Sequence, residues 1–143
     1  MSDVLVALYP IFKEEVFRRG ARIATLALAG SGGMLTGMFW FASMGGGWSA
    51  WERALCAAAV AALGGSLLHH IDREGARHAG AKEGLIRLER ALGLFDAGRH
   101  LPDDSLYPRA WQVVPPRGRA TRGAQLGVLA TTVLFIAELW VGG

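Results

Sequence analysis

The chain has 143 residues, of which 52% are hydrophobic and only 19% are charged, with 20 glycines and a formal net charge of +3. Soluble domains carry about a quarter charged residues, so this composition and a mean hydropathy of +0.29 exclude an ordinary soluble domain and a disordered chain. The charge is too small to indicate nucleic-acid binding, and the single Cys56 excludes an intrachain disulfide. The composition therefore indicates a small integral membrane protein.

The first 22 residues predict an N-terminal amphipathic helix that continues into a membrane span. Pro10 is expected in its first turn, where a missing N–H costs nothing. Ile11, Phe12 and Val16 are expected on its apolar side.

Residues 23–44 carry no charge and predict the first transmembrane helix. At about 1.5 Å per residue, such a helix crosses the ~30 Å hydrocarbon core. The stretch is rich in glycine and ends in Phe39, Trp40 and Phe41, which are typical of the membrane interface.

The glycine-rich residues 45–49 predict a tight turn, which returns the chain through the membrane as a second helix over 51–68. Its charge-free part, 54–68, is short for a span. Glu52 and Arg53 at one end, and His69 and His70 at the other, are expected at the level of the lipid headgroups.

Residues 70–122 are polar and predict one cytoplasmic amphipathic helix followed by a proline-rich loop. Apolar residues spaced four and three apart form one seam of this helix: Ala81, Leu85, Leu88, Leu92 and Phe95. Charged residues are expected on its other faces: Lys82, Glu83, Arg87, Glu89 and Arg90. Glu83 and Arg87 are spaced for an i,i+4 ion pair, and Gly98 is expected to end the helix.

Residues 123–143 predict a third transmembrane helix, with a segment lying on the membrane surface as the alternative. The predicted fold class is all-α, an integral membrane protein with three transmembrane helices, two at minimum. Its parts are the N-terminal helix 1–22, the transmembrane hairpin 23–69, the cytoplasmic part 70–122 and the third span 123–143.

The basic residues predict the orientation. Residues 1–22 hold four Lys or Arg and residues 70–122 hold ten, whereas the turn side holds only Arg53. The positive-inside rule therefore places the N-terminus in the cytoplasm. Arginine greatly outnumbers lysine and alanine is abundant, so we expect a bacterium with a GC-rich genome and hence its inner (cytoplasmic) membrane.

Three side chains after the second span could ligate a metal. His70, Glu74 and His78 follow each other at i, i+4 and i+8, and imidazole and carboxylate are ligands of Zn and Fe. The first and last lie about 12 Å apart along a helix axis, so a partner would have to complete the site. The alternative interpretation is a polar helix end in contact with lipid phosphate and water, without metal or haem.

Small residues recur every fourth position in the first two spans and predict close helix packing, within the hairpin or between subunits. They are Ala29, Gly33 and Gly37 in the first span, and Ala57, Ala61 and Gly65 in the second. The seam through Leu85, Leu88, Leu92 and Phe95 also needs a cover, either a protein partner, a second copy or the membrane surface. Three arginines before the third span are expected at lipid headgroups: Arg117, Arg119 and Arg122.

Two segments resemble bacterial RipA-like octameric membrane proteins: LIRLERALGLF at residues 85–95 and LYPRAW at residues 106–111. The order of a helix, a membrane hairpin and a cytoplasmic helix is similar too, whereas the third span departs from the two-span pattern of that group. The resemblance implies a ring-like homo-oligomer and transfers no catalytic residue.

These features predict a non-enzymatic accessory subunit of the membrane that self-assembles or docks into a larger membrane complex. Its expected partners are membrane lipids, further copies or other membrane subunits, with no nucleic acid and no cofactor. One alternative is an oligomeric pore. Another is a metal or haem component of a membrane redox complex, ligated by His69, His70 and His78, with His100 more distant.

Overall fold

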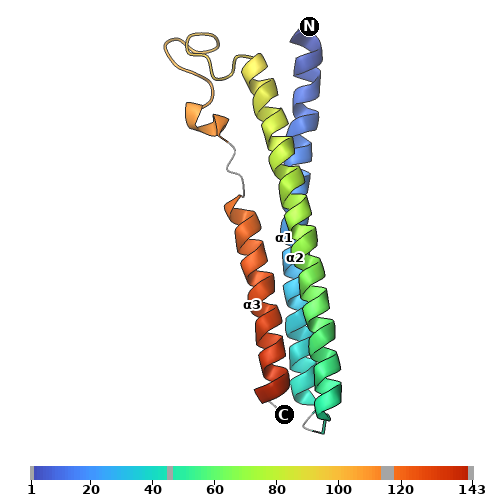
Figure 1. Cartoon of the computed structure of the whole chain (residues 1–143). Coiled ribbons are helices and arrows are strands. Elements are labelled where there is room, and N and C mark those ends of the chain that lie inside the picture. The colour runs from blue at the N-terminus through green and yellow to red at the C-terminus, as the bar shows by residue number, and fades with distance from the viewer. Residues whose placement is uncertain (1, 45–46, 114–117, 142–143) are drawn as a thin grey trace. The chain divides into compact units, whose positions relative to one another are not determined.

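The computed structural model describes residues 2–44, 47–113 and 118–141, and it is all-α, with 83% of these described residues in helices (Figure 1). Its elements are α1 (Ser2–Ser43), α2 (Ala50–Ala91), the short 3-10 helix η1 (Arg109–Gln112) and α3 (Arg119–Val141). No strand occurs among the described residues, where Leu101 and Asp104 form an isolated β-bridge. The expected fold class is confirmed, since α1, α2 and α3 are each long and apolar enough to cross a membrane.

Helix α1 runs without interruption from the amphipathic N-terminal stretch into the first apolar stretch. The placement of Pro10 in its first turn is wrong, because the helix begins at Ser2 and Pro10 lies inside it. A proline at this position removes the hydrogen bond that its N–H would donate to the carbonyl of Val6.

Helix α2 joins the second apolar stretch and the amphipathic helix, which the sequence separates, into a single element of 42 residues. A capping box starts it: the backbone N–H of Glu52 donates to Ser49 Oγ at 3.3 Å, and the N–H of Ser49 donates back to Glu52 Oε2 at 2.8 Å. Gly45 and Gly46 of the preceding turn lie outside the described residues.

Helix α2 ends at Ala91, so the expected stop at Gly98 is wrong. Gly93 has a positive φ of 73°, its N–H donates to the Arg90 carbonyl at 3.0 Å, and the N–H of Leu94 donates to the Glu89 carbonyl at 3.1 Å. These two bonds form a Schellman motif, which needs a residue in the left-handed region and therefore favours glycine.

The chain divides into two compact units. The membrane unit comprises Arg22–Glu74 and Arg119–Gly143, and the polar unit comprises Met1–Ala21 and Gly75–Gly118. The core of the membrane unit is built from all three long helices: Ile23, Met34, Val60, Ile71, Val128, Phe135 and Leu139.

Helices α1 and α2 are longer than a membrane requires. Each has 42 residues, which corresponds to about 63 Å at 1.5 Å per residue, against a hydrocarbon core of about 30 Å. Each of the three helices contains a stretch that is long and apolar enough for the membrane. The charged stretches 2–21 and 75–91 therefore lie outside the spanning segments.

Candidate interaction surface

Three glycines of the membrane unit allow close contact between its helices. A Cβ on Gly30 would lie 2.6 Å from Cδ1 of Leu67, and one on Gly37 would lie 3.1 Å from Cε1 of Phe135. A Cβ on Gly64 would collide with the Thr132 hydroxyl. Small residues at these positions let the backbones of α1, α2 and α3 approach.

The small residues singled out from the sequence divide between the interior and the exterior of the membrane unit. Gly37 meets Phe135, and Ala57 packs half-buried against the core. The other four are exposed: Ala29, Gly33, Ala61 and Gly65. The division has a geometric cause, because positions four apart on a helix drift by about 40°, so the ends of each set lie about 80° apart.

Gly33 and Gly65 are open positions. A Cβ at either glycine would meet no atom within 4 Å, so neither is small because of packing inside this chain. The contacts of a single copy, among the described residues, therefore do not explain why these two positions are glycine.

The predicted apolar seam is covered within the chain, although its last members Leu92 and Phe95 follow the end of α2 at Ala91 and so do not lie on the helix as expected. Leu88 and Phe95 are buried, Leu85 and Leu92 are half-buried, and Ile86, which the spacing did not include, is 5% exposed. Part of the cover is Tyr107, whose ring lies 6.1 Å from that of Phe95, centroid to centroid. The seam therefore does not need a second protein to be buried.

The basic and histidine positions lie mainly at the surface. Arg119 and Arg122 are exposed in the first turn of α3, and Arg117 lies outside the described residues. His69 and His70 are exposed, with their ring centroids 6.0 Å apart.

Glu74 and His78 are half-buried on α2, and His100 is exposed in the loop that follows α2. His78 faces Gly20, and its buried Nδ1 has no hydrogen-bond partner among the described residues. No group of three or more His, Cys, Asp or Glu among the described residues is arranged to hold a metal ion. Metal or haem binding stays a prediction from the sequence.

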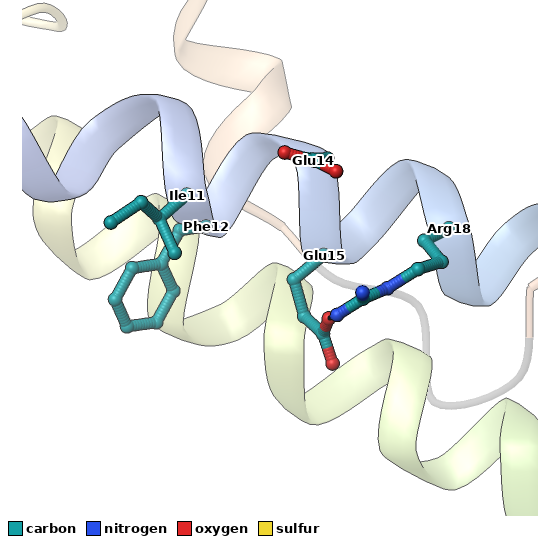
Figure 2. A pocket seen from close by; sticks show the side chains of 5 residues that line it. All are labelled: Ile11, Phe12, Glu14, Glu15 and Arg18. Atoms are coloured by element: carbon teal, nitrogen blue, oxygen red, sulfur yellow. Dashed lines mark hydrogen bonds and ion pairs between the residues drawn. The ribbon is translucent and has the colours of Figure 1, made fainter.

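Large apolar side chains of α1 are exposed outside the spanning segments. Val4 is 63% exposed, Ile11 61% and Phe17 70%. Figure 2 shows Ile11 and Phe12 beside a pocket of about 330 Å³, whose other lining residues are Glu14, Glu15 and Arg18. Glu15 forms an ion pair with Arg18, and this pair holds the pKa of Glu15 below its usual range. Only part of the expected apolar side of this helix is therefore covered.

A polar cluster in the polar unit was not found from the sequence. The hydroxyl of Tyr9 lies 2.8 Å from that of Tyr107 and donates to Glu89 Oε1 at 3.4 Å. The expectation that Glu89 lies on a charged outer face is wrong, because Glu89 is only 9% exposed. Tyr9 is 80 positions from Glu89 and 98 from Tyr107 in the chain, so no local spacing could bring it to them.

No protein-family model, curated protein or solved structure matches this chain. Its function must therefore be argued from its own residues.

Proposed function

We propose that the protein is a non-enzymatic subunit of the bacterial inner membrane that self-assembles or docks into a larger membrane complex. The observation that carries this proposal is the pair of open glycines, Gly33 on α1 and Gly65 on α2. Both lie in apolar stretches of the membrane unit, where Gly30, Gly37 and Gly64 by contrast meet side chains of neighbouring helices.

The physical argument depends on lipid as solvent. Lipid tails are as apolar as leucine, so helices associate in a membrane through close packing rather than through the hydrophobic effect. A glycine that faces lipid leaves a depression in the helix surface, whereas a glycine that faces another helix allows its backbone to approach. Gly33 and Gly65, together with the exposed Ala29 and Ala61, therefore favour an interface with a second protein.

The exposed apolar side chains of α1 support the same proposal outside the membrane. Val4, Ile11 and Phe17 belong to the polar unit, where exposure to water is unfavourable by about 25 cal/mol per Å² of apolar surface. A partner that follows α1 out of the membrane would cover them. Fourteen of the fifteen basic residues favour a cytoplasmic position for this unit and for the N-terminus.

The test is the mass of the assembly after mild extraction. We expect Gly33→Leu and Gly65→Leu to dissociate it, because a leucine would fill the space that the partner occupies, while helical content and thermal stability stay close to wild type. Leu28→Val is the matched control, since Leu28 is 76% exposed and carries no small-residue requirement. Gly37 is a poor test site, because a side chain there would strike Phe135 within the chain.

The proposal fails if both glycine variants keep the native mass of the wild-type assembly. Gly64→Leu provides the contrast, because its collision with Thr132 should lower the stability of the single chain itself. Loss of assembly without loss of stability separates an interface position from a core position.

A further inference from the structure

The polar cluster of Tyr9, Glu89 and Tyr107 joins three segments of the polar unit. Tyr9 comes from α1, Glu89 from the last turn of α2, and Tyr107 from the loop between α2 and η1. Tyr107 is itself held by the loop: its N–H donates to the Leu94 carbonyl at 3.0 Å, and its ring lies 5.4 Å from that of Trp111. A change at the cluster therefore acts on the whole loop.

Proton counting gives the direction of these hydrogen bonds. An ionised carboxylate only accepts, so Tyr9 donates its one hydroxyl proton to Glu89. The oxygen of Tyr9 must then accept from Tyr107, whose hydroxyl is 2.8 Å away. The chain of donors runs from Tyr107 through Tyr9 to Glu89 and ends on a carboxylate that is nearly removed from water.

The surroundings of Glu89 do little to compensate for its burial. From α1 it faces the Tyr9 hydroxyl and the charge of Lys13, whose Nζ lies 5.8 Å from the centre of the Tyr9 ring, and from the loop it is reached through Tyr107. Its neighbours one turn back on α2 are the uncharged Leu85 and Ile86. Burial raises the pKa of Glu89, and only in part do the hydrogen bond from Tyr9 and the charge of Lys13 oppose this shift. Burial also raises the pKa of the Tyr9 phenol, so the phenol stays protonated as a donor.

We propose that Tyr9, Glu89 and Tyr107 form a pH-sensitive clasp, which holds the loop after α2 against the two helices more tightly when Glu89 is protonated. A neutral carboxyl removes the burial cost of a charge, and its carbonyl oxygen still accepts from Tyr9. Because this pKa is higher in the folded than in the unfolded chain, the native state binds more protons in the window between the two values. The hold is therefore strongest at acid pH and weakens as the pH rises through the folded pKa.

Opening of the clasp would uncover part of the seam. Tyr107 covers the ring of Phe95, which is 3% exposed in the closed form. Deprotonation of Glu89 thus couples the pH on this side of the membrane to the exposure of an apolar surface. The clasp does not depend on assembly, because all its members lie in one chain.

Hydrogen exchange on the full chain in nanodiscs tests the clasp. We expect the amide of Tyr107, after correction for the intrinsic exchange rate, to lose protection as the pH is raised from acid to mildly alkaline through the raised pKa of Glu89. Glu89→Gln keeps the shape of the side chain and cannot ionise, so its protection should stay at the acid wild-type level across this range. Tyr107→Phe should lower protection at every pH, because the donor chain loses its first hydroxyl.

His100 provides the matched control, since it is a titratable ring on the same loop and its Nε2 lies 3.2 Å from the Leu92 carbonyl oxygen. His100→Gln should keep the full pH dependence. The proposal is overturned if the wild type shows no pH dependence, if Glu89→Gln retains it, or if His100→Gln abolishes it. Should Glu89→Gln fail to fold, unchanged protection in Tyr107→Phe would contradict the clasp equally well.

Discussion

The membrane unit and the polar unit differ in the contacts that stabilise the interior of each. The membrane unit buries a core of apolar side chains, and its buried hydroxyl of Thr132 donates to the carbonyl of Val128 on the same helix at 2.7 Å. Among its described residues, the polar unit buries three apolar side chains, Ile86, Leu88 and Phe95, together with the carboxyl group of Glu89. The difference follows from the solvent. Lipid offers no hydrogen bonds, so polar groups in the membrane must pair within the protein, whereas water near the polar unit lets a carboxyl group such as Glu89 exchange its proton.

The largest expected effect tests whether packing dominates the membrane unit. Phe135 is 8% exposed and lies against Gly37, so Phe135→Ala should destabilise the fold by about 3–5 kcal/mol through lost contacts and a cavity. Leu134→Ala is the control on the same helix, because Leu134 is 56% exposed and should cost much less. Unfolding by a denaturing detergent in bicelles measures both, and equal effects would contradict the assigned core.

An intermediate effect is expected at the end of α2, where the polar unit depends on backbone conformation. Gly93→Ala places an alanine in the left-handed region, at a positive φ, and should lower the free energy of unfolding by about 1–2 kcal/mol. Gly80→Ala should have the opposite effect and raise the free energy of unfolding by as much as about 1 kcal/mol, because alanine favours a helix more than glycine does. Gly80 lies inside α2, and an added Cβ would meet no described atom within 4 Å. Thermal unfolding followed by circular dichroism distinguishes them, and a stabilised Gly93→Ala variant would refute the Schellman ending.

The smallest effects are expected from removing one hydroxyl group in each unit. Tyr107→Phe removes the first donor of the clasp and should lower the free energy of unfolding by about 1 kcal/mol. Thr132→Val removes a hydroxyl that also points at Met34 Sδ, 3.3 Å away, and should cost about 0.6 kcal/mol, a typical value for polar contacts in a membrane. The same unfolding measurements apply, and a much larger loss in Thr132→Val would show that this hydroxyl stabilises the membrane unit more than its packing indicates.

Hydropathy was a reliable guide to the membrane helices, because length and lack of charge are properties of a single segment. The third helix, expected over 123–143, is described over Arg119–Val141. The continuity of α2 was missed, because its polar middle, with Gly75 and Gly80, carries no single apolar period. One helix passes from an apolar to a charged environment, and its buried face changes along the way.

The candidate interaction surface could be predicted only in outline. Repeated small residues indicated close packing, but spacing alone could not tell the open Gly33 from the packed Gly37, since that depends on where Phe135 of another helix lies. The position of Glu89 was predicted wrongly for a similar reason. A helix-surface pattern assumes one apolar seam, whereas here α1 and the loop cover a wider face that includes a carboxylate.

Native mass spectrometry of the protein released directly from membrane vesicles is the sharpest test of assembly. We expect the wild-type chain of 15.3 kDa to appear as a multiple of that mass or together with another membrane subunit. Gly33→Leu and Gly65→Leu should shift the signal toward the single chain without unfolding it. A wild-type protein that appears only as the single chain, with the same mass in both variants, would show that the protein does not assemble through these glycines.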